Sequence, residues 1–127
     1  MGMLNVLIID DDRDMRFGMK RIVSRCGHNA FEAECGEQAL KCLSENHFDL
    51  VFCDLRFPTE LSGAGILAAV QANFPDVKVV MMSCGMDFDT QEELLKNGAA
   101  AAVQKPFFKA DCIHLLDKLF PAAKQAA

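Results

Sequence analysis

Short apolar segments alternate with longer segments of helical periodicity along this chain, and this alternation constrains the fold more than any other feature. The apolar segments have hardly a polar break, which is typical of strands buried on both faces of a parallel sheet. Three of them are clear and two are weaker by composition. The five predicted strands lie at 6–9, 28–34, 49–54, 77–83 and 99–104.

The segments between these strands carry apolar residues at helical spacing. Gly27 and Gly98 are placed to end two of the helices, and Thr90 with Glu93 forms a capping-box pattern at the start of the fourth. Five alternations of strand and helix predict an α/β fold, a doubly wound parallel sheet with right-handed crossovers. The five predicted helices lie at 15–26, 36–46, 65–74, 90–97 and 112–120.

Size and composition narrow the class of protein. A chain of 127 residues, 51% hydrophobic and 24% charged, fits one ordinary domain, which we expect to span residues 1–120 with 121–127 as a tail or a cut linker. The net charge of -5 disfavours direct nucleic-acid binding. No segment is apolar for long enough to cross a membrane and no signal peptide is evident. We therefore expect a cytoplasmic protein whose six cysteines are reduced packing residues.

Polar residues follow the predicted strands at the edge where ligands bind in open parallel sheets. Asp10 and Asp11 follow the first strand, Asp54 ends the third, Ser83 ends the fourth and Lys105 follows the fifth. Taken singly, each could be a solvated loop residue, a helix cap or a surface side chain. Together they predict one polar site. A further acid, Asp12, is better placed to cap the first helix.

Four motifs carry a resemblance to a known family. "LIIDDD", "DLVFCDLRFP", "VVMMS" and "VQKPF" occur in this order over about residues 4–120. With them the chain resembles the receiver domains of two-component response regulators, of the CheY-like and NtrC-type kinds. The resemblance implies a flavodoxin-like (βα)5 fold with strand order 2-1-3-4-5.

The resemblance also implies a chemistry for the strand-end residues. Asp54 would accept a phosphoryl group from a phosphohistidine of a sensor histidine kinase or a phosphotransfer protein. Asp11 and Asp54 would bind Mg²⁺ directly, Asp10 through water, and Arg56 through its backbone carbonyl. Lys105 and Ser83 would bind the phosphoryl oxygens. The protein would be a switch that changes the surface of its fourth and fifth helices, where receivers also form homodimers, rather than an enzyme acting on a foreign substrate.

Two other functions remain open from the residues. One is a Mg²⁺-dependent phosphohydrolase with an aspartyl nucleophile, which Arg56 disfavours because a second acid is usual at that position. The other is a degenerate receiver that acts only as a binding module, which the complete set of polar strand ends disfavours.

The chain departs from the family pattern at several positions. Ala102 stands where many receivers have an aromatic residue, and we expect Met82 or Met86 to fill the space beside it. The loop that contains "TELSG" is one residue longer than usual. Arg56 and Cys84 stand at positions that, by the resemblance, influence how fast the phosphoryl group is lost.

Overall fold

The computed structural model describes residues 2–57 and 61–121, and in them five parallel strands form one sheet of order β2-β1-β3-β4-β5. This order and the alternation of strands with helices confirm the predicted doubly wound fold. The strands are β1 (Asn5–Ile9), β2 (Asn29–Ala33), β3 (Leu50–Asp54), β4 (Lys78–Ser83) and β5 (Ala101–Gln104). The helices are α1 (Arg13–Arg25), α2 (Gly36–Glu45), α3 (Gly63–Asn73), α4 (Phe88–Lys96) and α5 (Lys109–Leu119).

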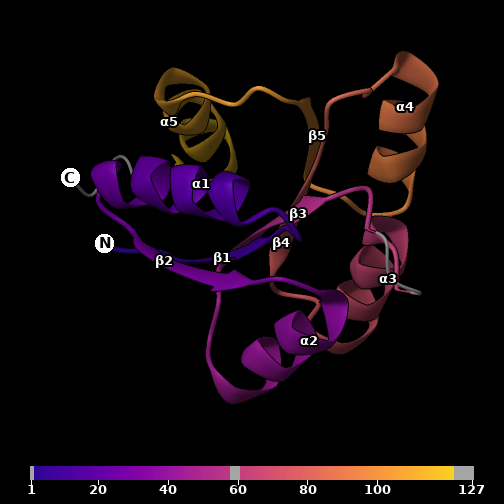
Figure 1. Cartoon of the computed structure of the whole chain (residues 1–127), viewed down its shortest axis with the longest axis horizontal. Helices are drawn as coiled ribbons and strands as arrows, with labels where there is room; N and C mark the ends of the chain where they lie inside the picture. Colours follow the sequence, from indigo (N-terminus) through magenta and orange to yellow (C-terminus); the bar gives the residue numbers. More distant parts are fainter. Residues whose placement is uncertain (1, 58–60, 122–127) are drawn as a thin grey trace.

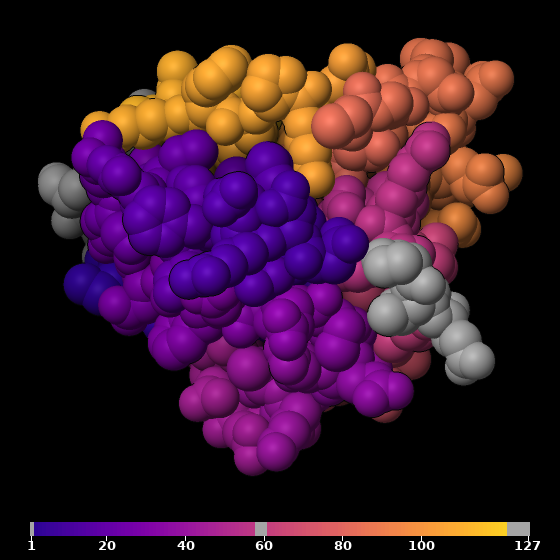
Figure 2. Space-filling view, in the orientation of Figure 1, coloured from indigo at the N-terminus to yellow at the C-terminus, as the bar shows by residue number. Residues whose placement is uncertain are grey.

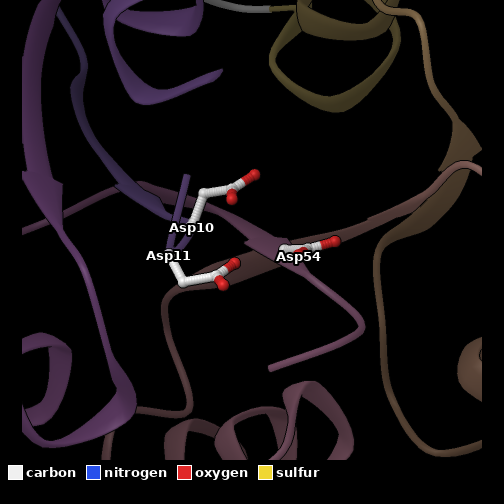
Figure 3. A group of neighbouring side chains, drawn as sticks. All are labelled: Asp10, Asp11 and Asp54. Carbon is white, nitrogen blue, oxygen red and sulfur yellow. The ribbon is translucent and has the colours of Figure 1, made fainter. Parts of the chain in front are cut away.

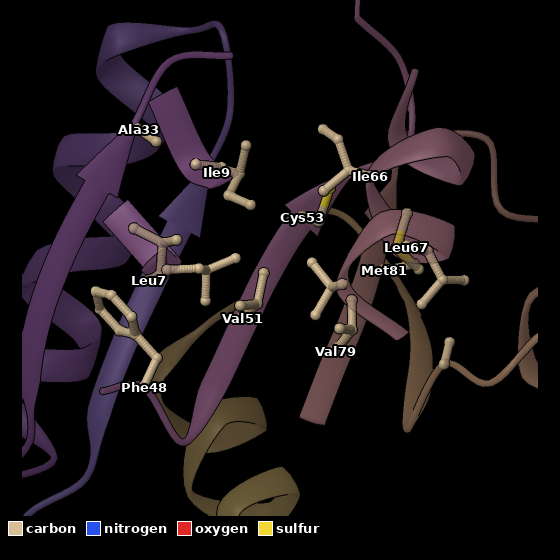
Figure 4. Close-up of a cluster of buried hydrophobic side chains, with 14 of the residues drawn as sticks. Leu7, Ile9, Ala33, Phe48, Val51, Cys53, Ile66, Leu67, Val79 and Met81 are labelled. Atoms are coloured by element: carbon tan, nitrogen blue, oxygen red, sulfur yellow. The ribbon is translucent and has the colours of Figure 1, made fainter. Parts of the chain in front are cut away.

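Helices cover both faces of the sheet, so the central strands are buried on both sides (Figure 1). On β1, Leu7 and Ile9 face the cluster under α2 and α3, whereas Val6 and Ile8 face the cluster under α1 and α5. Figure 4 shows the first cluster between the sheet and its helices. On the other face, α1 and α5 lie side by side, as the space-filling view also shows (Figure 2). Burial on both faces explains why these strands read as uninterrupted apolar segments.

Local signals set most of the helix ends. Asp12 caps α1 as expected, because its side chain accepts a hydrogen bond from the backbone N–H of Asp14. Gly27 and Gly98 follow α1 and α4 with positive φ angles of 90° and 106°, which glycine adopts without strain. The capping-box prediction at Thr90 is wrong.

The N-cap of α4 is Asp87, which accepts a hydrogen bond from the Thr90 N–H at 2.7 Å. The helix therefore begins at Phe88, and Thr90 lies within its first turn.

The surroundings of Ala102 differ in part from the prediction. Ala102 is buried on the face covered by α2 and α3, together with Met81, and Met86 packs against the same cluster. Met82 lies on the opposite face, under α1 and α5. Consecutive strand residues point to opposite faces of a sheet, so Met82 cannot share a face with Met81. The expectation for Met82 is therefore wrong, and Met86 is the methionine that packs on the correct side.

Two further expectations can be compared with the described residues, and a third falls largely outside them. All six cysteines are free thiols, with Cys53 buried and Cys84 exposed. No helix among residues 2–57 and 61–121 is long and apolar enough to cross a bilayer. Part of the lengthened loop and most of the predicted tail, residues 58–60 and 122–127, lie outside the described residues.

Candidate functional site: carboxylates at the carboxyl end of the sheet

The strand order brings the predicted acids together. β2 lies on one side of β1 and β3 lies on the other. The carboxyl ends of β1 and β3 are therefore at the switch point of the sheet. Ile9 pairs with Cys53, which places Asp10 beside Asp54. One oxygen from each of Asp10, Asp11 and Asp54 lies within 4.8 Å of the others. Figure 3 shows the three carboxylates extending to the same side of these strand ends.

Asp10 is the most constrained of the three acids and is 5% exposed. Its N–H donates to the carbonyl of Ala33, which continues the β1–β2 pairing by one residue. Its Oδ1 accepts from the Asp12 N–H at 2.9 Å, and its Oδ2 accepts from Lys105 Nζ at 3.0 Å. Asp10 is therefore held by β2 through its backbone, and by Asp12 and Lys105 through its carboxylate.

Lys105 reaches the site from the end of β5, across β4. Its N–H donates to the Ser83 carbonyl, and the cis peptide bond to Pro106 follows directly. Lys105 Nζ lies 3.0 Å from Asp10 Oδ2 and 3.3 Å from Asp54 Oδ1. Burial acts to lower the pKa of Lys105, but the hydrogen bonds and charges of Asp10 and Asp54 outweigh it and raise that pKa. The lysine is thus a fixed positive charge that offsets part of the carboxylate repulsion.

Asp54 ends β3 in a partly dry environment. Burial raises the pKa of its carboxyl, and the charge of Asp10 acts in the same direction. Lys105 and the backbone N–H of Arg56 oppose this and favour the ionised form. Its carboxylate is therefore ionisable, poorly hydrated and oriented by two donors, which suits an oxygen nucleophile.

Backbone packing around Asp54 also requires Gly63 at the start of α3. A Cβ built on Gly63 would lie 2.4 Å from the Asp54 carbonyl oxygen and 2.6 Å from Leu55 Cα. The Gly63 N–H donates to the Leu55 carbonyl at 3.2 Å. Only glycine allows the chain to return this closely over the end of β3.

The remaining predicted residues border the same site. Ser83 is buried at the end of β4, and its Oγ accepts from the Gly85 N–H at 3.2 Å. Arg56 is exposed, and its Nη2 lies 3.7 Å from the position that a Cβ on Gly85 would take. The Leu55 N–H donates to Met82 O at 2.8 Å. Of the two amides that follow Asp54, only that of Arg56 therefore faces the carboxylate.

One residue that contacts this site is not predicted from the sequence. Arg16 on α1 is 8% exposed, and its Nη1 donates to the Asp10 carbonyl at 2.8 Å. Its Nε donates to Glu32 Oε1 at 2.9 Å. The signal in the sequence is a pair of cations four residues apart, Arg16 and Lys20, before a strand with acids two residues apart, Glu32 and Glu34.

The donor set fits a hard divalent cation. Three carboxylates offer oxygen ligands at one point, and Mg²⁺ prefers oxygen ligands and keeps several waters. Two of the acids are buried or half-buried and Asp11 is exposed, which leaves a side open to solvent. The site can therefore hold Mg²⁺ beside an activated carboxylate and a lysine.

Comparison with known proteins agrees with this arrangement. The family model for the response regulator receiver domain matches residues 6–117. The chain therefore belongs to the response regulator receiver domain family.

Its relatives include longer regulators. The transcriptional regulatory protein ZraR of Escherichia coli (strain K12) is 33% identical over 103 residues, which are 81% of this chain and 23% of ZraR. The crystal structure of NtrX from Brucella abortus has a TM-score of 0.88 at 26% identity, over 98% of this chain and 28% of that chain. The receiver domain of that NtrX, solved separately, has a TM-score of 0.82 at 27% identity, over 94% of this chain and 98% of that domain. This chain spans about a quarter of the length of these longer relatives.

Proposed function

We propose that this chain is the phosphoacceptor domain of a two-component response regulator, with residues 1–120 as the receiver and Asp54 as the acceptor. The observation that carries the proposal is the contact of Lys105 with Asp10 and Asp54 beside a third carboxylate, Asp11. Family membership supports the same role. A histidine kinase or a phosphotransfer protein would supply the phosphoryl group, in the cytoplasm.

In this proposal Asp11 and Asp54 bind Mg²⁺ directly, Asp10 binds through water and Arg56 through its carbonyl. The ion would neutralise charge on the transferring phosphoryl oxygens, as metal ions do in phosphoryl transfer. The protein residues hold that ion in place and orient the nucleophile. The fit of three oxygen donors within 4.8 Å supports this assignment.

The transfer uses residues that already touch. A carboxylate oxygen of Asp54 attacks phosphorus, the new O–P bond forms as the P–N bond of phosphohistidine breaks, and the imidazole leaves. Lys105 moves its hydrogen bond from Asp54 Oδ1 to a phosphoryl oxygen, because in the acyl phosphate the negative charge lies on the phosphoryl oxygens and no longer on the carboxyl group of Asp54. The Ser83 hydroxyl donates a hydrogen bond to a second phosphoryl oxygen and keeps its proton. Attack of water on phosphorus later releases inorganic phosphate and restores Asp54. The domain would therefore act as a switch with a limited lifetime and would not turn over a foreign substrate.

The donor would approach over α1. A groove of about 320 Å³ lies between α1 and the end of β5, lined mainly by apolar side chains and reaching Lys105. Met15, Met19 and Ile22 line its α1 wall, and Pro106 and Phe107 line the other. An amphipathic helix bearing phosphohistidine fits such a groove.

The proposed output surface is the face of α4 and α5. Phe88 and Leu95 on α4 and Ile113 on α5 are exposed apolar side chains. A homodimer or a partner domain would cover them once Asp54 is phosphorylated. Sedimentation with and without beryllofluoride and Mg²⁺ measures this step, and an unchanged mass would contradict the homodimer.

A small phosphodonor tests the central proposal without the kinase. Incubated with phosphoramidate and Mg²⁺, the chain should gain the mass of one phosphoryl group, and chelation of Mg²⁺ should prevent the gain. Asp54→Asn should not be labelled, whereas Asp76→Asn, at an exposed acid before β4, should be labelled like the parent. Phosphate mapped to Ser83 or to a histidine would overturn the assignment.

A further inference from the structure

Arg16 lies in α1, and its side chain contacts the backbone at the carboxylate site. The side chain is nearly inaccessible and joins three parts of the chain: α1, the end of β1, and β2. Nη1 donates to the Asp10 carbonyl at 2.8 Å, Nε donates to Glu32 Oε1 at 2.9 Å, and Nη2 lies 3.7 Å from Glu34 Oε2. A planar guanidinium can satisfy such divergent partners at once, whereas an ammonium group cannot.

The contact with Asp10 fixes a peptide plane that the site depends on. The carbonyl of Asp10 and the N–H of Asp11 belong to one planar unit, so holding the carbonyl also fixes the direction in which Asp11 leaves β1. The N–H of Asp10 is held by the Ala33 carbonyl. Arg16 thereby acts on both acids through the main chain.

Asp11 needs this backbone support more than its neighbours do. Asp10 has donors on both carboxylate oxygens, and Asp54 has Lys105 on Oδ1. Within the part of the chain that the structure describes, no hydrogen bond reaches the exposed Asp11 carboxylate. Its position therefore follows from its backbone.

Two acids at the end of β2, Glu32 within it and Glu34 directly after it, balance the charge of Arg16. A buried cation near a cation site would oppose Mg²⁺ binding, but Glu32 and Glu34 face the same guanidinium. Lys20 Nζ binds Glu32 Oε2 at 2.7 Å, so two cations and two acids form one group with no net charge. Arg16 can hold Asp10 without adding a net positive charge beside the carboxylates.

We infer that Arg16 is a positioning residue for the metal site, which orients Asp10 and Asp11 through the main chain and so sets the affinity for Mg²⁺. This inference rests on the proposed function of the site. Partners of metal ligands outside the coordination sphere change affinity by about 10–100-fold when removed. A loss of about tenfold is expected here, because the ligands themselves remain.

The matched variants are Arg16→Met, Arg16→Lys and Lys20→Met. Arg16→Met keeps an apolar stem and removes the donor to the Asp10 carbonyl, whereas Lys20→Met removes a contact to Glu32 and leaves Asp10 untouched. Mg²⁺ titrations followed by amide shifts should give about tenfold weaker binding for Arg16→Met. Arg16→Lys should have a Mg²⁺ affinity between those of Arg16→Met and the parent, and it replaces Arg16→Met in the test if that variant does not fold. Lys20→Met should bind like the parent.

A kinetic split separates positioning from general loss of structure. With phosphoramidate as donor, the Arg16 variants should need more Mg²⁺ for half-maximal labelling, yet reach the rate of the parent at saturation, because Asp54, Lys105 and Ser83 are intact. Equal Mg²⁺ dependence in folded Arg16→Lys and Lys20→Met would overturn the inference.

Metal-free protein distinguishes failure of this inference from failure of the proposed function. If the parent binds no Mg²⁺, the proposed function fails. The amide shifts of Asp11 and Asp12 without metal then still test positioning: they should move more in Arg16→Met or Arg16→Lys than in Lys20→Met. Equal shifts in these variants would overturn the role of Arg16 whatever the parent binds.

Discussion

The two ends of the sheet differ in how their acidic and polar side chains are paired. At the amino end, Asp49 Oδ2 accepts from the Asn5 N–H at 2.8 Å, and His28 Nδ1 accepts from the Leu4 N–H at 3.0 Å. The polar groups there bind one another and connect neighbouring strands. At the carboxyl end, three carboxylates lie close together, and the ammonium group of Lys105 contacts two of them, Asp10 and Asp54.

The difference separates a structural network from a binding site. At the amino end, the Asp49 carboxylate has a donor from the chain itself, so nothing more is needed to hold it. The carboxyl end carries an excess of two negative charges when the acids are ionised, and close like charges destabilise a fold. A site that gives up stability in this way is suited to bind a cation, which supplies the missing positive charge.

The largest expected effect is at the carboxyl end, with Asp11→Asn. The amide keeps the shape and removes one anionic ligand, so Mg²⁺-dependent labelling of Asp54 should fall below detection. The metal-free variant should be at least as stable as the parent because a repulsion is relieved. Magnesium titration and thermal unfolding of the same samples measure both. Equal Mg²⁺ affinity in variant and parent would contradict the metal assignment.

At the amino end, Asp49→Ala should lower stability and leave the labelling of Asp54 unchanged. The half-buried Asn5 N–H loses its acceptor, which costs about 1 kcal/mol of unfolding free energy. Labelling of Asp54 should keep its rate at temperatures where the variant is folded. Asp49→Asn is the matched control and should lose less, since its amide oxygen can still accept. Urea unfolding measures the free energies, and a stable Asp49→Ala would show that the network is dispensable.

Asp54→Asn should change the free energy of unfolding less than Asp49→Ala does, and it should raise it. Burial raises the pKa of Asp54, so its ionised form is disfavoured by folding at neutral pH. The neutral amide should therefore raise the free energy of unfolding by about 0.5 kcal/mol, a small gain because Lys105 already offsets part of the penalty. Below the unfolded pKa, where both states are protonated, the gain should disappear. A variant less stable than the parent at pH 7 would contradict this sign.

The smallest effect is the pH dependence from His28. Burial lowers the pKa of His28 in the folded state, while Asp49 acts weakly against this. The unfolded chain therefore takes up a proton first as pH falls through about 6.5, and stability is lost from there down to the folded pKa. His28→Gln should flatten the profile by about 0.3 kcal/mol, because the side chain is largely hydrated. Urea midpoints between pH 7.5 and 5 measure it, and parallel profiles would contradict it.

Much of this contrast can be predicted from the sequence. Uninterrupted apolar segments identify the central strands, and their polar ends locate Asp10, Asp11 and Asp54 at one edge once strand order is known. The family resemblance supplied that order, and the sheet confirms it. Local capping signals place Asp12 and Gly27 correctly.

The predictions from sequence fail where contacts in the folded chain, and not the local sequence pattern, determine the position of a residue. Asp87 displaces Thr90 as the cap of α4 because it is extended and its carboxylate reaches the Thr90 N–H. Met82 faces away from Ala102, since strand alternation overrides closeness in sequence. Arg16 reads as an ordinary helix cation until β2 brings Glu32 against it.

The hydrogen bond of Lys105 to Asp10 joins residues 95 positions apart. A chain under synthesis presents its acids early, but the lysine arrives only when the last strand has been added to the edge of the sheet. Domains made from the amino terminus onward pass through such partial states. A nascent or truncated chain that ends before β5 would thus display Asp10 and Asp54 without the lysine that binds them. Under the proposed function, phosphoryl labelling of Asp54 would report that the chain has been made as far as Lys105 and has folded.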